Sequence, residues 1–277
     1  MTAAITSLRW TLADSWTITR RTLIHWVREP APVVFGLGFS ILIALMFAFL
    51  FGGAMAVPGG GDYKEFLMPG MFGMNMLFGI SATMTAVSAD ATRGVTDRLR
   101  SMPMSPAAVL LGRGIADMFD SMVVLVGLVL VGLAIGWQPH GSAGDTALAF
   151  VLLLLLRFAF IWLGVYLGLV AKSPEMVGSM QVLEFPLGFL SSAFVAPATM
   201  PGWLGTIAEC NPLSATVGAI RELFGNPGMS NPELGNPELG GGSWIAQHAV
   251  PMAFAWPLVL IAIFAPLAVR RYRRLSR

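Results

Sequence analysis

The sequence predicts an all-α integral membrane protein that forms one transmembrane domain over residues 1–277 and crosses the bilayer six times. Apolar residues make up 56% of the 277 residues and charged residues only 12%, which is more apolar surface than a soluble fold of this size can bury. Several uncharged runs approach the roughly 20 residues that a helix needs to cross the hydrocarbon. Their polarity does not alternate with a period of two, so helices rather than a β-barrel satisfy their backbone in lipid.

Uncharged runs define five of the predicted spans, and the distribution of charge supports the sixth. The spans are predicted at residues 33–55, 66–88, 107–136, 147–171, 176–196 and 250–269. The fifth is the weakest, because it contains Glu184 and Pro186. Arginine is concentrated before the first span, between the second and third, and after the last, and Lys172 lies between the fourth and fifth. By the positive-inside rule both termini are cytoplasmic, which requires an even number of spans.

The segment 1–32 is predicted to be a helix that lies in the headgroup region. Trp16 and Trp26 recur with other apolar residues at helical spacing, while Arg21 and Arg28 fall on the other side. An apolar face with tryptophan and a basic polar face suit an interfacial helix. A soluble cytoplasmic helix is the alternative.

Two further segments are predicted outside the membrane, between the fifth and sixth spans. Residues 199–225 hold two apolar pieces that are too short to span, which indicates a re-entrant or interfacial helical pair. Residues 226–243 contain the tandem repeat Asn-Pro-Glu-Leu-Gly and a glycine run, which is typical of a flexible external loop. Cys210 is the single cysteine, so the chain has no internal disulfide.

The cytoplasmic loop after the second span is predicted to contain a two-turn amphipathic helix. A glycine opens it and a proline ends it, with three apolar residues on one face and the charges elsewhere. This helix could dock in a groove of a partner protein, and a basic loop that only fixes topology is an equally good interpretation. Its candidate docking residues are Gly94, Val95, Asp97, Arg98, Leu99, Arg100, Met102 and Pro103.

Ionisable residues lie within three of the predicted spans. Asp117 and Asp120 are in the third, Arg157 in the fourth and Glu184 in the fifth. Charges at this depth are costly and usually face the protein interior in pairs. Counting about 1.5 Å per residue from the cytoplasmic end gives Asp120 and Arg157 a similar depth. We therefore predict an Asp120–Arg157 pair, with Glu184 as the alternative partner, serving either a transport path or the register of the helices.

The sequence lacks the motifs of a catalytic centre. It has no Gly-x-x-x-x-Gly-Lys phosphate loop, no histidine or cysteine cluster with metal-ligand spacing, and no Gly-x-Ser-x-Gly elbow. We expect no enzyme activity, metal or cofactor on this chain and no nucleic-acid partner. The pattern favours a conduit that receives energy from another protein.

Several short motifs occur in an order that resembles the type-2 ABC transporter permeases, especially the daunorubicin/doxorubicin-resistance permease group. Together they cover nearly the whole chain. They are Arg20-Arg21 followed by Arg28-Glu-Pro30, Phe66-Leu-Met-Pro-Gly70, Gly94-Val-Thr-Asp-Arg-Leu-Arg-Ser-Met-Pro103, Leu111-Gly-Arg-Gly-Ile-Ala-Asp117, and Asn211-Pro-Leu-Ser-Ala-Thr-Val-Gly-Ala-Ile-Arg221.

The resemblance implies a permease subunit of an ATP-driven exporter in the bacterial plasma membrane, moving an amphipathic drug, antibiotic or lipid. Two permease copies would pair with two separately encoded ATPase subunits, which bind ATP and magnesium. Residues 94–103 would be the coupling helix. Spans one and five of both copies would line the path, and the re-entrant pair would close it outside. Secondary contacts with the ATPase would involve Arg20, Arg21, Lys172 and Pro174.

An ion-coupled secondary transporter that uses the intramembrane Asp, Glu and Arg residues is the alternative function. Such transporters are commonly built from inverted repeats. The two halves of this sequence show no similarity to each other, which favours the exporter.

Overall fold

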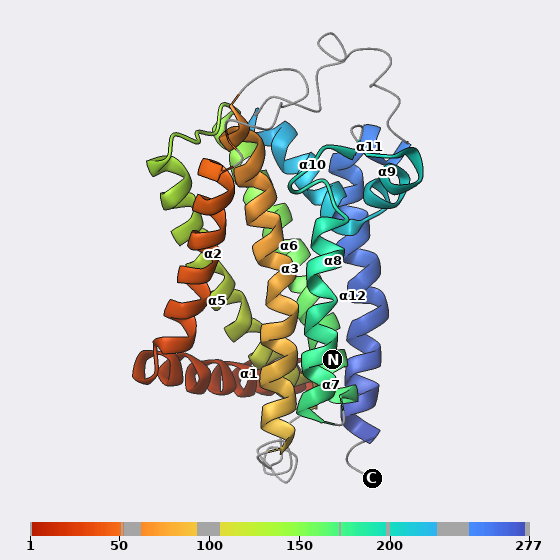
Figure 1. Ribbon diagram of the computed structural model, residues 1–277. Coiled ribbons are helices and arrows are strands. Elements are labelled where there is room, and N and C mark those ends of the chain that lie inside the picture. The colour runs from red at the N-terminus through yellow and green to blue at the C-terminus, as the bar shows by residue number, and fades with distance from the viewer. Residues whose placement is uncertain are drawn as a thin grey trace.

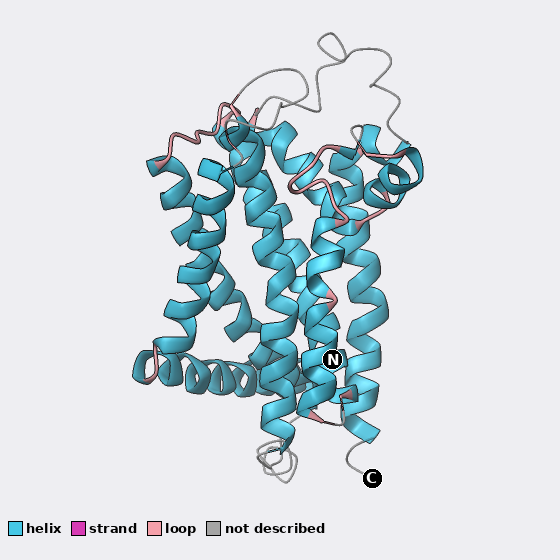
Figure 2. Cartoon of the chain, viewed as in Figure 1, coloured by secondary structure: helices cyan, strands magenta, loops and turns pink. Residues whose placement is uncertain are grey.

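The computed structural model describes residues 2–50, 52, 62–92, 106–171, 173–197, 200–225 and 244–274. These residues fold into helices joined by short turns, and none of them forms a strand (Figure 2). The predicted all-α class is therefore confirmed. The repeat within 226–243 and the amphipathic segment 94–103 lie outside the described residues.

Most of the helices run roughly parallel along one long bundle (Figure 1). Among the described residues, α2, α3, α5, α6 and α12 are long and apolar enough to cross a membrane, and they lie over predicted spans one to four and six. In chain order the helices are α1 (Thr2–Arg28), α2 (Ala31–Leu50), α3 (Tyr63–Thr92), α5 (Pro106–Ala134), α6 (Ala143–Val170), α7 (Pro174–Val182), α8 (Glu184–Phe189), α9 (Gly202–Glu209), α10 (Pro212–Phe224), α11 (Trp244–Gln247) and α12 (Ala249–Arg274).

The predicted fifth span is not one continuous helix. It consists of α7 and α8, which are separated at Leu183, and α8 ends at Phe189 rather than continuing to residue 196. The physical reason is Pro186, which has no N–H to donate to the carbonyl of Val182, so the helical hydrogen-bond pattern is interrupted there. The two helices lie end to end beside α3 (Figure 1).

Helix α1 runs across one end of the bundle, roughly perpendicular to the long helices (Figure 1). It packs against the start of α5 through two hydroxyls: Ser15 Oγ donates to the carbonyl of Ala108 at 3.0 Å, and Thr19 Oγ1 to that of Gly112 at 2.9 Å. A Cβ at Gly112 would lie 2.5 Å from the Ser15 carbonyl oxygen, so glycine permits the close approach.

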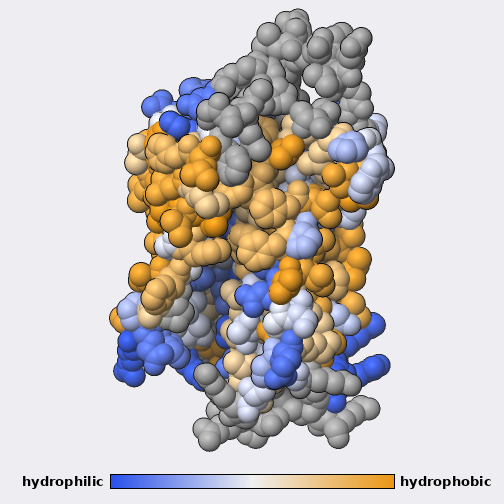
Figure 3. Space-filling view, viewed as in Figure 1, coloured by the Kyte–Doolittle hydropathy of each residue, from blue (hydrophilic) through white to orange (hydrophobic). Residues whose placement is uncertain are grey.

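The interior of the bundle is built around α3 and α6, which pack along each other and are largely buried, whereas α2 and α12 are mostly exposed. The exposed side chains of α2 are apolar, and they form part of the hydrophobic surface in Figure 3. A peripheral helix with exposed apolar side chains is stable in lipid and unfavourable in water. These exposed residues include Val34, Phe35, Phe39, Leu42, Phe49 and Leu50.

Helices α9, α10 and α11 gather at the end of the bundle opposite α1 and the C-terminus (Figure 1). Within this group α10 is the most buried, and it packs against α3, α6 and α12. Its side chain–side chain contacts include an aromatic cluster in which Phe224 meets Phe72, Trp137 and Phe150 at centroid distances of 5.2 to 6.3 Å. The short α9 ends at Glu209, and the next residue, Cys210, is free and exposed.

Candidate functional site

The predicted coupling residues Gly94 to Pro103, and Lys172 with them, lie outside the described residues. The structure does describe the helices that flank the segment, because α3 ends at Thr92 and α5 begins at Pro106. Of the other predicted contacts, Arg20 and Arg21 are exposed on α1, and Pro174 is the first residue of α7. Proline suits this position because its missing N–H would have no helical partner there.

An ionic link joins α3 to α5 close to these helix ends. Arg113 on α5 places Nη1 3.3 Å from Asp90 Oδ2 on α3, and Nε 3.1 Å from Asp117 Oδ1 one turn further along α5. The second oxygen of Asp117 accepts a hydrogen bond from Thr83 Oγ1 on α3 at 2.7 Å. Asp117, which the sequence predicted as an intramembrane charge, is thus paired and hydrogen-bonded.

The same network continues to Arg157 on α6, whose side chain is only 1% exposed. Its Nε donates to Ser121 Oγ on α5 at 2.6 Å, and its Nη2 donates to Thr83 Oγ1 at 3.2 Å. Gly79 provides the space for the guanidinium, since a Cβ there would lie 2.5 Å from Nη1. Arg157 therefore connects α3, α5 and α6 through two hydroxyl groups.

The predicted Asp120–Arg157 ion pair is not formed in this structure. Within the described part of the chain, no ion pair joins Arg157 to Asp120 or to the alternative partner Glu184. Both carboxylates, together with Asp117, lie close enough for their charges to act on the guanidinium. Glu184 is 5% exposed, and its Oε1 makes no hydrogen bond. The three acidic groups thus act on Arg157 through their charge and form no ion pair with it.

A second polar cluster, at the other end of the bundle, is centred on Arg221 of α10. Its side chain is 1% exposed and donates only to backbone carbonyls: Nε and Nη2 to Phe66 at 3.1 and 2.9 Å, Nη1 to Ser192 at 2.8 Å, and Nη2 to Ala193 at 3.0 Å. The guanidinium also lies 3.6 Å from the centroid of the Phe66 ring. Four hydrogen bonds and a cation–π contact compensate for its burial.

Two more polar side chains, one at the N-cap of α10 and one in its first turn, contact the end of α8 and the segment that follows it. Asn211 accepts from the Leu213 amide at 2.9 Å as the N-cap of α10, and its Nδ2 donates to the carbonyls of Leu187 and Leu190, each at 2.9 Å. One residue therefore caps the start of α10 and the end of α8.

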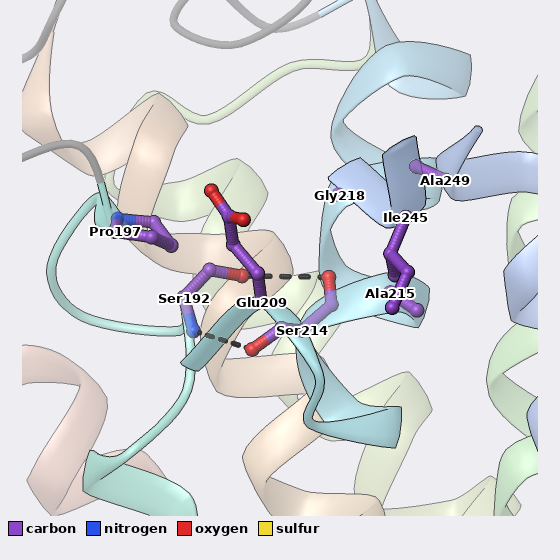
Figure 4. Close-up of a pocket in the computed structure, with 8 residues that line it drawn as sticks. All are labelled: Ser192, Pro197, Glu209, Ser214, Ala215, Gly218, Ile245 and Ala249. Carbon is purple, nitrogen blue, oxygen red and sulfur yellow. Dashed lines mark hydrogen bonds between the residues drawn. The ribbon is translucent and has the colours of Figure 1, made fainter. Parts of the chain in front are cut away.

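Ser214 makes the third connection to this segment. Its Oγ accepts from the Ser192 amide at 2.9 Å, and its carbonyl accepts from Ser192 Oγ at 3.4 Å (Figure 4). A small hollow adjoins this contact (Figure 4). It is lined by Ser192, Pro197, Glu209, Ser214, Ala215, Gly218, Ile245 and Ala249.

The sequence indicated neither the role of Arg221 nor that of Ser214, although a usable signal was present. Asn211, Ser214 and Arg221 are separated by three and seven residues, which places them on one face of a helix. The structure also explains the glycine of the Pro69-Gly70 motif, because a Cβ at Gly70 would overlap the carbonyl oxygen of Ala193. Glycine there lets α3 approach the backbone that Arg221 binds.

Comparison with known proteins identifies the family. The model of the ABC-2 type transporter family matches residues 14–224. The chain is 31% identical to the daunorubicin resistance ABC transporter permease protein DrrB1 of Streptomyces coeruleorubidus, over 98% of this chain and 88% of that protein.

More distant relatives are proteins named as the transport permease ycf38. The one from Pyropia yezoensis is 28% identical over 75% of this chain and 72% of its own length. The one from Porphyra purpurea is 25% identical over 76% of this chain and 73% of its own length. With a family match over most of its length and a relative that aligns almost from end to end, the chain belongs to the ABC-2 type transporter family.

Proposed function

We propose that this chain, the membrane permease subunit of an ABC exporter, moves an amphipathic drug, antibiotic or lipid out of the cytoplasm or the inner leaflet. The proposal rests on the 31% identity to DrrB1 across 98% of the chain, since that relative is named for daunorubicin resistance. The energy would come from ATP and magnesium bound by a separately encoded ATPase. Two ATPase copies would work with this chain and a second permease copy in the bacterial plasma membrane.

The proposed membrane arrangement has six crossings, with α7 and α8 together as the fifth. Residues 174–189 would span about 24 Å as helix, and the turns that follow would complete the crossing of a roughly 30 Å hydrocarbon layer. Helix α1 would lie at the cytoplasmic interface and α9 with α10 at the external side. Their positions at opposite ends of the bundle support this assignment (Figure 1).

Energy would enter through the segment 94–103 as a coupling helix, with secondary contacts from Arg20, Arg21, Lys172 and Pro174. The link from Arg113 to Asp90 and Asp117 supports this proposal, because it connects the two helices on either side of the segment. A displacement of the segment would therefore move α3 and α5 together. Through Thr83, Ser121 and Arg157 it would also reach α6.

The substrate path would lie along the first and fifth spans of the two permease copies. Both carry exposed apolar and aromatic side chains that suit an amphipathic molecule. They are Phe35, Phe39 and Met46 on α2, and Phe185, Leu187 and Phe189 on α8. The ion-coupled alternative has less support, because Asp117 and Arg157 already bond to other side chains: Asp117 pairs with Arg113, and Arg157 donates to Ser121 and Thr83.

Co-purification with an ATPase subunit, sought first in the neighbouring reading frame, tests the proposal. We expect the reconstituted pair to hydrolyse ATP faster in the presence of daunorubicin and to move that fluorescent compound across the vesicle membrane. A chain that neither binds the ATPase nor supports ATP-dependent daunorubicin movement would contradict the proposal for this substrate class.

The coupling helix has its own test, Leu99→Asp. A charge on the apolar face of this helix should disrupt its docking in an apolar groove, so transport should fail while membrane insertion remains normal. Ser101→Asp, which adds the same charge to the same segment at a position that is not a predicted docking residue, is the matched control. Normal transport by Leu99→Asp would refute the assignment.

A further inference from the structure

Polar side chains at the N-cap of α10 and within it help to hold the end of the predicted fifth span. Helix α8 has only six residues, and the chain then passes through turns from Leu190 to Ala196. Asn211, Ser214 and Arg221 contact this region at Leu187, Leu190, Ser192 and Ala193. The position of the fifth span's end therefore depends on α10.

Arg221 is the strongest of these three contacts, because it also binds α3. Its guanidinium joins the carbonyl of Phe66 to those of Ser192 and Ala193, so one side chain holds α10, α3 and the end of the fifth span together. The planar guanidinium presents five N–H donors on three nitrogens in a fixed geometry, so it reaches separated carbonyls, whereas the three donors of lysine sit on one nitrogen.

The contact that Arg221 makes can open and close, because hydrogen bonds to neutral carbonyls hold its buried charge and water can replace them. Among the described residues no carboxylate lies within ion-pair distance of it, so its charge is satisfied by neutral carbonyls alone. Once these bonds break, water can solvate the guanidinium, and a buried charge without its partners is strongly unfavourable. Two states are thus favoured: fully bonded, and open with the guanidinium hydrated.

We propose that Arg221 is a positioning residue that latches the outer end of the fifth span, and that substrate leaves only when this latch opens. Asn211 and Ser214 assist it by holding the same segment. This inference rests on the proposed function, because it assumes that α10 lies on the external side. The latch would keep the path closed while no ATP is bound.

The experiment measures access to Ala215, which is 4% exposed and lines the hollow beside Ser192 and Ser214 (Figure 4). Ala215→Cys in a Cys210→Ser background carries one thiol, because Cys210 is the chain's single cysteine. A membrane-impermeant maleimide is added outside cells that express the permease with its ATPase, and the cells are either depleted of ATP or kept energised. Without ATP the parent reporter should react slowly, and ATP turnover should speed the reaction.

Adding Arg221→Gln should raise the labelling rate without ATP by about tenfold or more, since hydrogen bonds from a charged donor are lost, and ATP should raise it no further. Arg221→Lys should also label faster than the parent, because it keeps the charge but not the geometry. Arg274→Gln is the control and should label like the parent, because Arg274 lies at the end of α12 that is far from the hollow, which Ala249 lines at the other end. Loss of the ATP response is a readout that a purely structural role would not produce.

Parent-like labelling of Arg221→Gln would overturn the latch. If that variant fails to reach the membrane, Ser214→Ala decides the matter: faster labelling than the parent supports the latch, and an unchanged rate overturns it. The two proposals fail separately, because the absence of daunorubicin movement in the parent complex contradicts the proposed function, whereas unchanged labelling in a complex that transports daunorubicin contradicts only the latch.

Discussion

Substituting Gly79 by alanine should break the buried network around Arg157. The added Cβ would lie 2.5 Å from Nη1 and 2.8 Å from Nε of Arg157, so the guanidinium must move away. It would lose its hydrogen bonds to Ser121 and Thr83, each worth about 1.5–3 kcal/mol for a charged donor. Alanine regains about 1 kcal/mol through helix propensity. We expect the free energy of unfolding to fall by about 2–5 kcal/mol.

Denaturant unfolding of the purified permease in detergent micelles measures this change. Gly38→Ala is the matched control, because a Cβ there meets nothing within 4 Å, and its stability should be unchanged or slightly higher. The decisive comparison is a double-mutant cycle with Arg157→Met. Once the guanidinium is absent, Gly79→Ala should cause little further loss. If the two losses simply add, the steric explanation is wrong.

Two further predictions concern the two polar clusters. Gly70→Ala should destabilise the protein by about 1–3 kcal/mol, because its Cβ would overlap a backbone carbonyl that cannot rotate away. Thermal unfolding measures this loss. Gly178→Ala is the control whose unfolding temperature should stay the same, because a Cβ there meets nothing within 4 Å. Arg113→Gln should lower daunorubicin movement per ATP hydrolysed by about tenfold, while ATP hydrolysis persists. A tenfold loss corresponds to a change of about 1–2 kcal/mol in the coupling free energy between the ATPase contact and the path. Unchanged transport per ATP would show that the link to Asp90 carries no coupling.

The sequence predicted the helices well because the length of an apolar run is a local property. The five long helices lie over five predicted spans, and most bounds differ by a few residues. The fifth span was harder, because hydropathy and charge do not report whether a helix is continuous. Pro186 was visible in the sequence and accounts for the break at Leu183.

The predicted Asp120–Arg157 pair failed for a geometric reason. Counting residues gives depth in the membrane, but a pair also requires both side chains to point toward each other. One residue along a helix changes the direction by about 100°, and Ser121, the neighbour of Asp120, is the residue that reaches Arg157. Arg221 escaped prediction because its partners are backbone carbonyls, which every residue possesses and no motif marks.

Helix α3 connects the two clusters, and this bears on how a displacement could travel through the protein. Near one end, Asp90 and Thr83 bond to Arg113, Asp117 and Arg157; near the other, the Phe66 carbonyl accepts from Arg221. A continuous helix transmits an axial or tilting movement over its whole length, about 45 Å for the 30 residues of α3. A tilt of α3 would therefore move the Phe66 carbonyl relative to the carbonyls of Ser192 and Ala193, and Arg221 bridges them through hydrogen bonds of 2.8 to 3.1 Å. Because those bonds weaken steeply with distance and misalignment, even a small tilt is enough to favour the open state of the latch.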